Sequence, residues 1–173
     1  EENGGTVFMI HNKSASAPIP GKGVGESIKP DSITKYSELN DIKDWRRMLS
    51  PQYECPIKVD GLHWNTVEHY VQANKYKVSN QELYKKLSLE SRTKVSSNII
   101  EALTMINTGI RVIDDGYNRS RFLERGFEER IKQNEISRLV LSLTKPAKLT
   151  QYRHKYPAIE MKELMKVRNK IEM

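Results

Sequence analysis

Cysteine is nearly absent from this sequence, which has one, Cys55, among 173 residues. An internal disulfide is therefore excluded, and a single cysteine fits a reducing compartment. Long apolar runs are absent too, since no segment approaches the about 18 consecutive apolar residues of a membrane span. The first residues show no charged-then-apolar signal pattern. We expect an intracellular protein, cytoplasmic or nuclear and not secreted, with no membrane partner and with Cys55 as a packed thiol.

Several recurring catalytic patterns are also missing. His63 and His69 have no partner at metal-ligand spacing, so we expect no metal. There is no Gly-x-Ser-x-Gly nucleophile motif and no internal repeat. The glycine-rich loop from Gly21 to Glu26 lacks both the spacing of a Walker loop and the strand and helix that frame a dinucleotide fingerprint. Its backbone N–H groups can still form a small anion nest beside Lys22.

Positive charge is in excess: 29 Lys and Arg stand against 22 Asp and Glu, a net charge of +7. This balance favours anionic partners such as nucleic acid, pyrophosphate or phosphorylated sugars. The basic residues are dispersed along the chain, so an ordinary solvated basic surface is the alternative. The sequence has no recognition helix, aromatic ribonucleoprotein motif or zinc finger, which disfavours a plain nucleic-acid binder.

Glycine, proline and other turn residues, together with the spacing of apolar residues, predict the secondary-structure elements. A chain of this length suits one domain. We expect a strand at 6–10, a loop at 14–30, a strand at 53–59 that runs into a turn at Asp60 and Gly61, and helices at 64–76, 80–89, 96–107, 118–143 and 159–171. The sequence therefore predicts a single compact α+β domain that is predominantly α-helical and has a few short strands.

An acid, an amide and an amine share one stripe of the helix expected at 64–76. Glu68, Gln72 and Lys75 are spaced i, i+4 and i+7, which places them on one helical face. Such a stripe lines a site or faces solvent. In the second case Asn65 caps the helix, Glu68 reaches back to the capping backbone, and Gln72 and Lys75 are solvated.

The segment around this stripe resembles the NADAR family, which is named for NAD and ADP-ribose and includes bacterial N-glycosidases acting on riboflavin-pathway intermediates. The shared residues are Pro56, Ile57, Lys58, Val59, Asp60, Gly61, Trp64, Thr66, Glu68, His69, Tyr70, Gln72, Ala73, Lys75 and Tyr76. Residues 130–149 and 163–168 resemble the family's later helices, and residues 44–50 resemble the lead-in of viral and eukaryotic members. The resemblance implies an N-terminal extension at 1–35, with a short strand and a Gly/Pro-rich loop, and a NADAR-like domain at 36–173.

What the resemblance implies about chemistry centres on Glu68, which matches the family's catalytic glutamate. Cleavage of a ribose C1–N bond passes through an oxocarbenium-like sugar, so a carboxylate serves as base toward water or as electrostatic partner of the cation. No cofactor is implied. The candidate catalytic residues are Glu68 and Asp115, and the candidate substrate-binding residues are Ser50, Trp64, His69, Gln72, Lys75, Tyr117, Lys148 and Arg168.

The chain also departs from the bacterial members. They carry a Trp ahead of the long helix and an Asp in a Trp-Gly-Asp loop before the last helix, and this sequence has neither. By position, Tyr117 supplies an aromatic surface, and Asp114 or Asp115 replaces the acid. The later loop is shortened to residues 151–157 and has no acid, and Pro51 replaces a polar pocket residue.

These departures favour the ADP-ribose-directed branch of the family. Arg153, His154, Lys155 and Arg168 suit a pyrophosphate or a DNA backbone, or else form a basic surface. One hypothesis is an N-glycosidase that removes ADP-ribose from modified guanine in nucleic acid or cleaves a related phosphoribosyl substrate. The alternative is a module that binds ADP-ribose or nucleotides without cleaving them.

Overall fold

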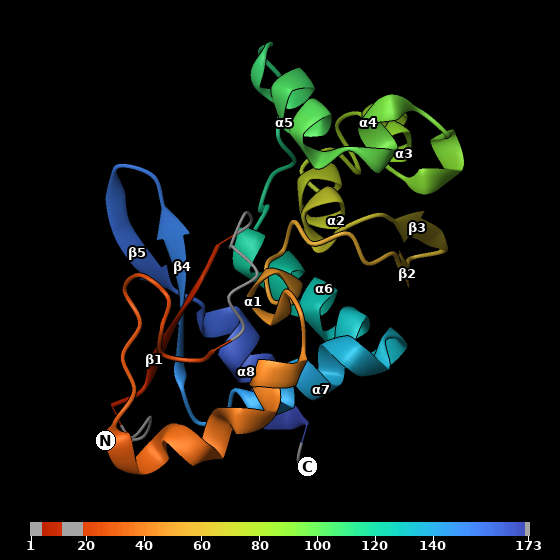
Figure 1. Ribbon diagram of the computed structural model, residues 1–173. Coiled ribbons are helices and arrows are strands. Elements are labelled where there is room, and N and C mark those ends of the chain that lie inside the picture. The colour runs from red at the N-terminus through yellow and green to blue at the C-terminus, as the bar shows by residue number, and fades with distance from the viewer. Residues whose placement is uncertain (1–4, 12–18, 172–173) are drawn as a thin grey trace. The chain divides into compact units, whose positions relative to one another are not determined.

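The computed structural model describes residues 5–11 and 19–171 (Figure 1). It confirms the α+β class and the predominance of helices. Contacts within the chain define two units. Unit 1 consists of residues 1–50 and 135–173, and unit 2 consists of residues 51–134. The predicted division of the chain at residue 35 stays a prediction.

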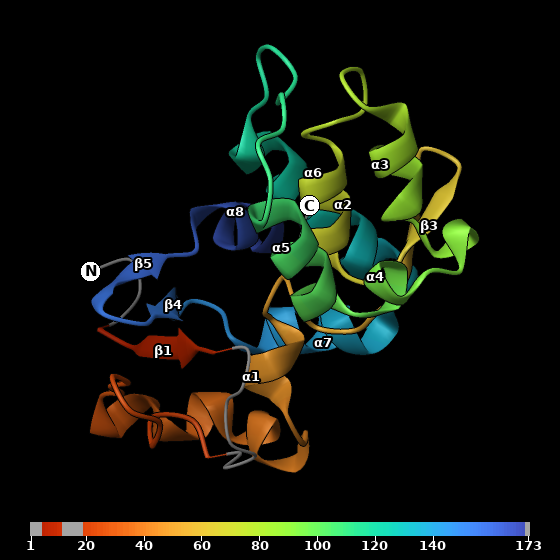
Figure 2. The ribbon, with the colours of Figure 1, turned by 90° about the horizontal axis from the view of Figure 1, so that it is seen from above.

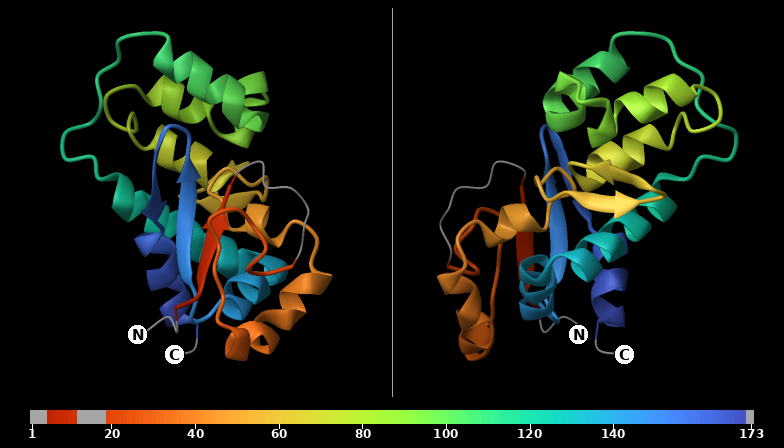
Figure 3. Two further views of the ribbon diagram at one scale, coloured as in Figure 1. Left: turned by 60° about the vertical axis from the view of Figure 1, so that its left-hand side comes forward. Right: turned by 90° about the vertical axis from the view of Figure 1, so that its right-hand side faces the viewer.

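Unit 1 is built on a three-stranded sheet with the order β1, β4, β5. β1 (Val7–Ile10) pairs in parallel with β4 (Lys148–Arg153), and β4 pairs antiparallel with β5 (Tyr156–Glu160). The strand predicted near residues 6–10 is therefore confirmed. β1 and β4 come from opposite ends of the chain and lie side by side (Figure 1). The β4–β5 hairpin continues past the last paired residue of β1 (Figure 3).

Four helical segments complete the described part of unit 1. They are η1 (Pro30–Asp41), which is a 3₁₀ helix, α1 (Trp45–Met48), α7 (Glu135–Leu143) and α8 (Lys162–Lys170). Phe8 from β1 packs edge-to-face on Tyr36 of η1 and on Trp45 of α1, with ring centroids 5.0 and 5.3 Å apart. Such aromatic contacts add to the free energy of burial. This cluster joins the first strand to the first two helical segments.

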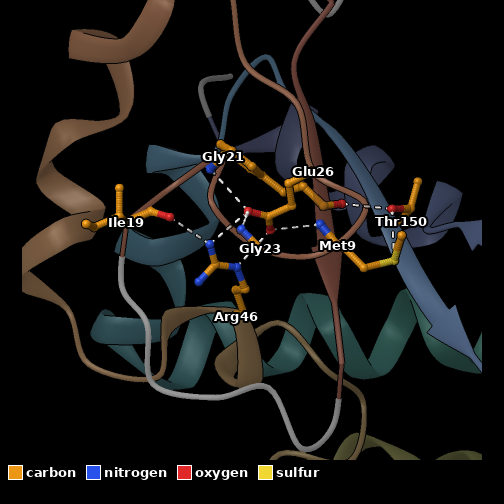
Figure 4. A network of polar contacts seen from close by, with 8 residues as sticks. Met9, Ile19, Gly21, Gly23, Glu26, Arg46 and Thr150 are labelled. Carbon is orange, nitrogen blue, oxygen red and sulfur yellow. Dashed lines mark hydrogen bonds and ion pairs between the residues drawn. The ribbon is translucent and has the colours of Figure 1, made fainter.

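The glycine-rich loop does bind an anion, and that anion is the chain's own Glu26. Its carboxylate accepts hydrogen bonds from the backbone N–H groups of Gly21 and Gly23, each at 3.1 Å, and of Met9 at 3.0 Å (Figure 4). Arg46 of α1 adds a bidentate ion pair, with Nε at 2.7 Å and Nη2 at 2.8 Å. The predicted anion nest is therefore occupied internally, which ties the loop to β1 and α1.

Unit 2 begins with a β-hairpin of β2 (Ile57–Val59) and β3 (Leu62–Trp64). Asp60 and Gly61 both have positive φ, 55° and 80°. This is the backbone of a type I′ turn, which a glycine at the second position favours. The turn predicted at Asp60 and Gly61 is confirmed, but the strand before it is shorter than expected, and the turn leads into a second strand, β3, that was not predicted. The helix expected from residue 64 starts later, at Val67.

The remaining elements of unit 2 are helical: α2 (Val67–Ala73), α3 (Gln81–Lys86), η2 (Leu89–Ser91), α4 (Lys94–Ser97), α5 (Ile99–Asn107) and α6 (Arg119–Gln133). α2 contacts β3, α3, α5 and α6, and Figure 2 shows it between these elements. All seven residues of α2 are buried. The helix that carries the Glu68 stripe is therefore the centre of unit 2.

Close approach of α2 to α6 depends on Gly126. A Cβ at this position would lie 2.7 Å from Val67 Cγ1. We expect Gly126→Ala to lower the free energy of unfolding by about 1–3 kcal/mol, because overpacking outweighs the gain in helix propensity. Urea unfolding measures this change. Val67→Ala removes the opposing methyl groups, so the double variant should be less destabilised than the sum of the single variants, whereas additivity would contradict this packing contact.

Further expectations about the elements are wrong. The helix predicted at 96–107 is two helices, α4 and α5, because Asn98 leaves the helical conformation at φ −139° and ψ 107°. The helix predicted at 118–143 is two helices, α6 and α7, because Asn134 leaves the helical conformation at φ −133° and ψ 112°. The helix predicted from residue 159 starts at Lys162, and residues 159–160 belong to β5. Residues 151–157, expected as a loop, form most of the β4–β5 hairpin. No helix in the described part of the chain is long and apolar enough to cross a membrane.

Candidate active site

Local sequence fixes where α2 starts. Thr66, and not Asn65, is the N-cap, and its Oγ1 accepts a hydrogen bond from the backbone N–H of His69 at 3.0 Å. Asn65 instead donates to the backbone oxygen of Ser97. The capping alternative for Glu68 is therefore wrong, which leaves its carboxylate available for other partners.

Glu68 is buried in a bidentate ion pair with Arg119. Arg119 Nη1 and Nη2 donate to the two carboxylate oxygens at 3.0 and 2.9 Å, and Gln72 Nε2 donates to Oε1 at 3.0 Å. Glu68 and Gln72 are only 5% and 7% exposed, so the solvated-face alternative does not hold for them. Three hydrogen bonds fix the position of the carboxylate, and charge-assisted bidentate pairs are the strong kind.

Arg119 is the functional candidate that sequence patterns missed. It is the first residue of α6, whose N-cap Asn118 accepts a hydrogen bond from the backbone N–H of Arg121. Its pairing with Glu68 joins positions 51 residues apart, so no helical spacing reports it. The Arg119 side chain is 44% exposed while that of Glu68 is 6% exposed. Arg119 therefore lies between the buried carboxylate and solvent.

Lys75 lies near this pair, just beyond the end of α2, and is half-buried. Burial lowers the pKa of the Lys75 ammonium, repulsion from Arg119 lowers it further, and attraction to Glu68 opposes both effects. Gln72 Oε1 is buried and accepts no hydrogen bond from the described residues. The site thus holds one carboxylate, two cations and one unsatisfied carbonyl oxygen.

The Tyr117 ring lies beside α2 and provides an aromatic surface. Its hydroxyl donates to the backbone oxygen of Val71 at 2.8 Å, and its ring stacks on Phe122 at 5.4 Å between centroids. Burial raises the pKa of the Tyr117 phenol to about 12, so it stays protonated at neutral pH. Tyr117 therefore supplies a neutral ring, as expected of an aromatic surface.

The two candidate acids before α6 have different environments. Asp114 accepts hydrogen bonds from the backbone N–H groups of Val78 and Ser79 at 2.8 and 2.7 Å, so it holds a loop in place. Asp115 is exposed and has no hydrogen bond or ion pair with any described residue. The predicted catalytic part of Asp115 stays a prediction that no contact with Glu68 supports.

Trp64 and His69 are packed inside unit 2, both with 0% exposure. Trp64 Nε1 donates to the backbone oxygen of Val59, and its ring packs on Tyr70 and Tyr84. His69 Nδ1 contacts Thr66 Oγ1 and Nε2 contacts the backbone oxygen of Val95 at 2.8 Å. In this structure neither side chain offers a surface to a substrate, because both are covered by the core that positions α2.

The buried His69 predicts a pH dependence. Burial lowers the pKa of its imidazole below 6.5. The unfolded chain then takes up a proton near pH 6.5 that the folded protein binds only at lower pH, so the free energy of unfolding falls as pH decreases through this window. Urea unfolding between pH 5 and 7 is the measurement. His69→Gln should show a weaker slope, and an NMR titration of His69 with an unshifted pKa would contradict the prediction.

The other three candidates belong to unit 1. Ser50 is buried, with 1% exposure, and Lys148 is half-buried on β4. Arg168 is buried on α8, where Nη1 donates to the backbone oxygen of Ala147 at 2.8 Å and to Thr144 Oγ1 at 3.1 Å. The structure therefore brings together Glu68, Gln72, Lys75 and Tyr117 in unit 2. No group of three or more His, Cys, Asp or Glu among the described residues is placed to hold a metal ion.

Comparisons with known proteins find a similar fold and similar sequences. No family model matches the chain. The solved NMR structure of the E. coli protein YbiA has a TM-score of 0.59 and 23% identity, and the match covers 73% of this chain and 79% of that one. The α+β fold of this chain is thus similar to that of YbiA.

Several proteins of similar sequence are named N-glycosidases. Proteins named N-glycosidase YbiA from Shigella sonnei and from E. coli K12 are 28% and 27% identical to this chain, with 78% of this chain and 78% of theirs covered. The resemblance to the NADAR family is confirmed by these homologues. The closer likeness to viral and eukaryotic members stays a prediction.

Proposed function

We propose that this protein is an N-glycosidase that hydrolyses a ribose C1–N bond, with ADP-ribose on a modified guanine, or a related phosphoribosyl compound, as its substrate. The observation that carries the proposal is the buried Glu68 carboxylate, fixed by Arg119 and Gln72 on the central helix. The motif match to the family's catalytic glutamate and the N-glycosidase name of the relatives support it.

The geometry suits stabilisation of a sugar cation. Loss of the base leaves positive charge on C1 and the ring oxygen, and a fixed carboxylate in a buried site stabilises that charge. Glu68 also accepts the proton of the attacking water once an oxygen is free. Both oxygens now bind Arg119, so Arg119 turns outward when substrate enters. The Arg119 side chain is 44% exposed, so solvent can take the place of the carboxylate.

Charge around Glu68 favours an anionic substrate. Burial lowers the pKa of the Lys75 ammonium most, and repulsion from Arg119 lowers it further. A phosphate between the two cations removes this repulsion and also draws Arg119 away from the carboxylate. The unsatisfied Gln72 Oε1 accepts a hydrogen bond from a ribose hydroxyl or from the attacking water. A pyrophosphate-linked ribose supplies all of these groups.

The missing Trp and Trp-Gly-Asp motifs direct the proposal toward ADP-ribosyl substrates and, through the net charge of +7, toward nucleic acid that carries them. The test is incubation of the protein with ADP-ribosylated guanine DNA, NAD and a phosphoribosylamino-pyrimidine in parallel, with products identified by mass. We expect ADP-ribose to be released from the modified DNA. Recovery of all three compounds unchanged, under conditions where the protein is folded, would contradict an N-glycosidase.

A binding module is the second candidate, because no second carboxylate among the described residues contacts Glu68 and Asp115 is exposed. Both candidates use Lys75 as a cation for the ligand. Lys75→Ala should weaken ADP-ribose binding about tenfold, since it removes one charge-assisted contact from a half-buried site. Calorimetry measures this, with the exposed Lys85→Ala as the matched control. Equal affinities of both variants and the parent would place the ligand elsewhere.

A further inference from the structure

Unit 1 contains a cavity lined by cations. It has a volume of about 500 Å³ and lies against β4, β5 and α8. Its charged lining consists of Lys145, Lys148, Lys162, Lys166, Arg168 and one carboxylate, Glu160. Five cations against one anion give this cavity a strongly positive potential. Its volume falls within the range of small-molecule sites, about 300–1,000 Å³.

Arg168 is the unusual member of this lining. Its residue exposure is 5%, yet its charged group has no carboxylate partner among the described residues. Nη1 donates to neutral oxygens of Thr144 and Ala147, and Nε is buried without a hydrogen-bond partner. A buried charge without a counter-ion is costly, and a buried N–H without an acceptor adds to that cost.

The charge of Arg168 persists at neutral pH. Burial lowers the pKa of its guanidinium to about 10, which leaves it protonated. Its electrostatic neighbour Tyr36 is not a counter-ion, because burial raises the pKa of that phenol above its usual value. Nη1 donates to the backbone oxygens of Thr144 and Ala147, which follow the C-terminal end of α7, where a cation is favourable. This position does not account for Nε, which has no acceptor.

We propose that this cavity is a binding site for a phosphate group, with Arg168, Lys148 and Lys162 of its lining as the cations that hold it. An oxyanion supplies the missing counter-charge, and Arg and Lys are residues that commonly bind phosphate in proteins. The inference goes beyond glycoside cleavage and does not depend on Glu68. A free nucleotide or a nucleic-acid backbone would present the same phosphate chemistry.

The Arg168 Nε–H NMR signal tests the site directly. Inorganic pyrophosphate, ADP-ribose and a short oligothymidylate are titrated separately at constant ionic strength set with sodium chloride. We expect at least one to shift this signal in a saturable way, because a bound anion beside the guanidinium changes the electrostatic environment of its N–H groups. Saturation by the small compounds assigns the site to a free nucleotide, and saturation by the oligothymidylate assigns it to a backbone. A signal unmoved by all three would overturn the proposal.

Lysine variants distinguish a specific phosphate site from non-specific attraction to a basic surface. Lys148→Gln with Lys162→Gln should weaken binding about tenfold, while Lys35→Gln with Lys43→Gln, exposed lysines of the same unit that do not line the cavity, should leave it nearly unchanged. Glu160→Gln should tighten binding, since it removes the one lining carboxylate. Equal weakening of binding by both lysine pairs would show that only non-specific electrostatic attraction is involved, and it would overturn the proposal. Glu68→Gln should not alter this binding, which keeps the test separate from glycosidase activity.

Discussion

Replacement of Glu68 by Gln is expected to lower the rate of ribose–base cleavage by several orders of magnitude while the fold and ligand binding persist. Gln has the same shape but cannot carry the charge that stabilises the sugar cation or take the proton of water. Arg119 loses its counter-charge, yet its side chain is 44% exposed, so water solvates it and the cost to stability is small. The effect therefore appears in turnover and not in affinity.

Single-turnover rates of the parent and of Glu68→Gln give the size of this effect, and circular dichroism reports the fold. The matched control is Glu82→Gln, which removes an exposed carboxylate from α3 in the same unit. It should leave the rate unchanged. If Glu68→Gln turns over as fast as the parent, the carboxylate has no part in the chemistry.

The second large effect concerns stability. Glu26→Gln should lower the free energy of unfolding by about 3–5 kcal/mol, because it leaves the Arg46 charge buried without its partner. The side chains of Arg46 and Glu26 are 7% and 0% exposed, so solvent does not replace the lost contact. The new amide N–H₂ group also faces donors, namely Arg46 and the N–H groups of Gly21 and Met9.

Urea unfolding measures the change, and an exposed ion pair supplies the control. Lys94 and Glu101 are 3.2 Å apart, with side chains 76% and 45% exposed. Glu101→Gln should therefore change stability by less than about 0.5 kcal/mol. A similar small change for Glu26→Gln would mean that the network in Figure 4 does not hold the loop.

Local signals predicted the elements around the site. The Asp60–Gly61 turn requires positive φ at both positions, and a hairpin forms there. The i, i+4 spacing of Glu68 and Gln72 placed them on one face, where they are hydrogen-bonded. These features depend on residues within a few positions of one another, so sequence alone reports them.

Features that depend on distant residues were missed. The parallel pairing of β1 with β4 joins Val7 to Lys148, which are far apart in the sequence. All residues of β5 are exposed, so no alternation of apolar and polar residues marks that strand. Apolar spacing continues through Asn134 although the helix does not, because periodicity reports burial and not the backbone of one residue. Arg119 is likewise recognised as a site residue only by its tertiary contact with Glu68.

The mass of the products formed from an oligonucleotide with ADP-ribose on guanine tests the central claim most directly, with parent and Glu68→Gln in parallel. If Glu68 drives C1–N hydrolysis, the parent releases free ADP-ribose and an unmodified oligonucleotide, and the variant releases neither. Stoichiometric binding of an oligonucleotide that is recovered with its ADP-ribose intact from the parent would contradict hydrolysis and identify a binding module.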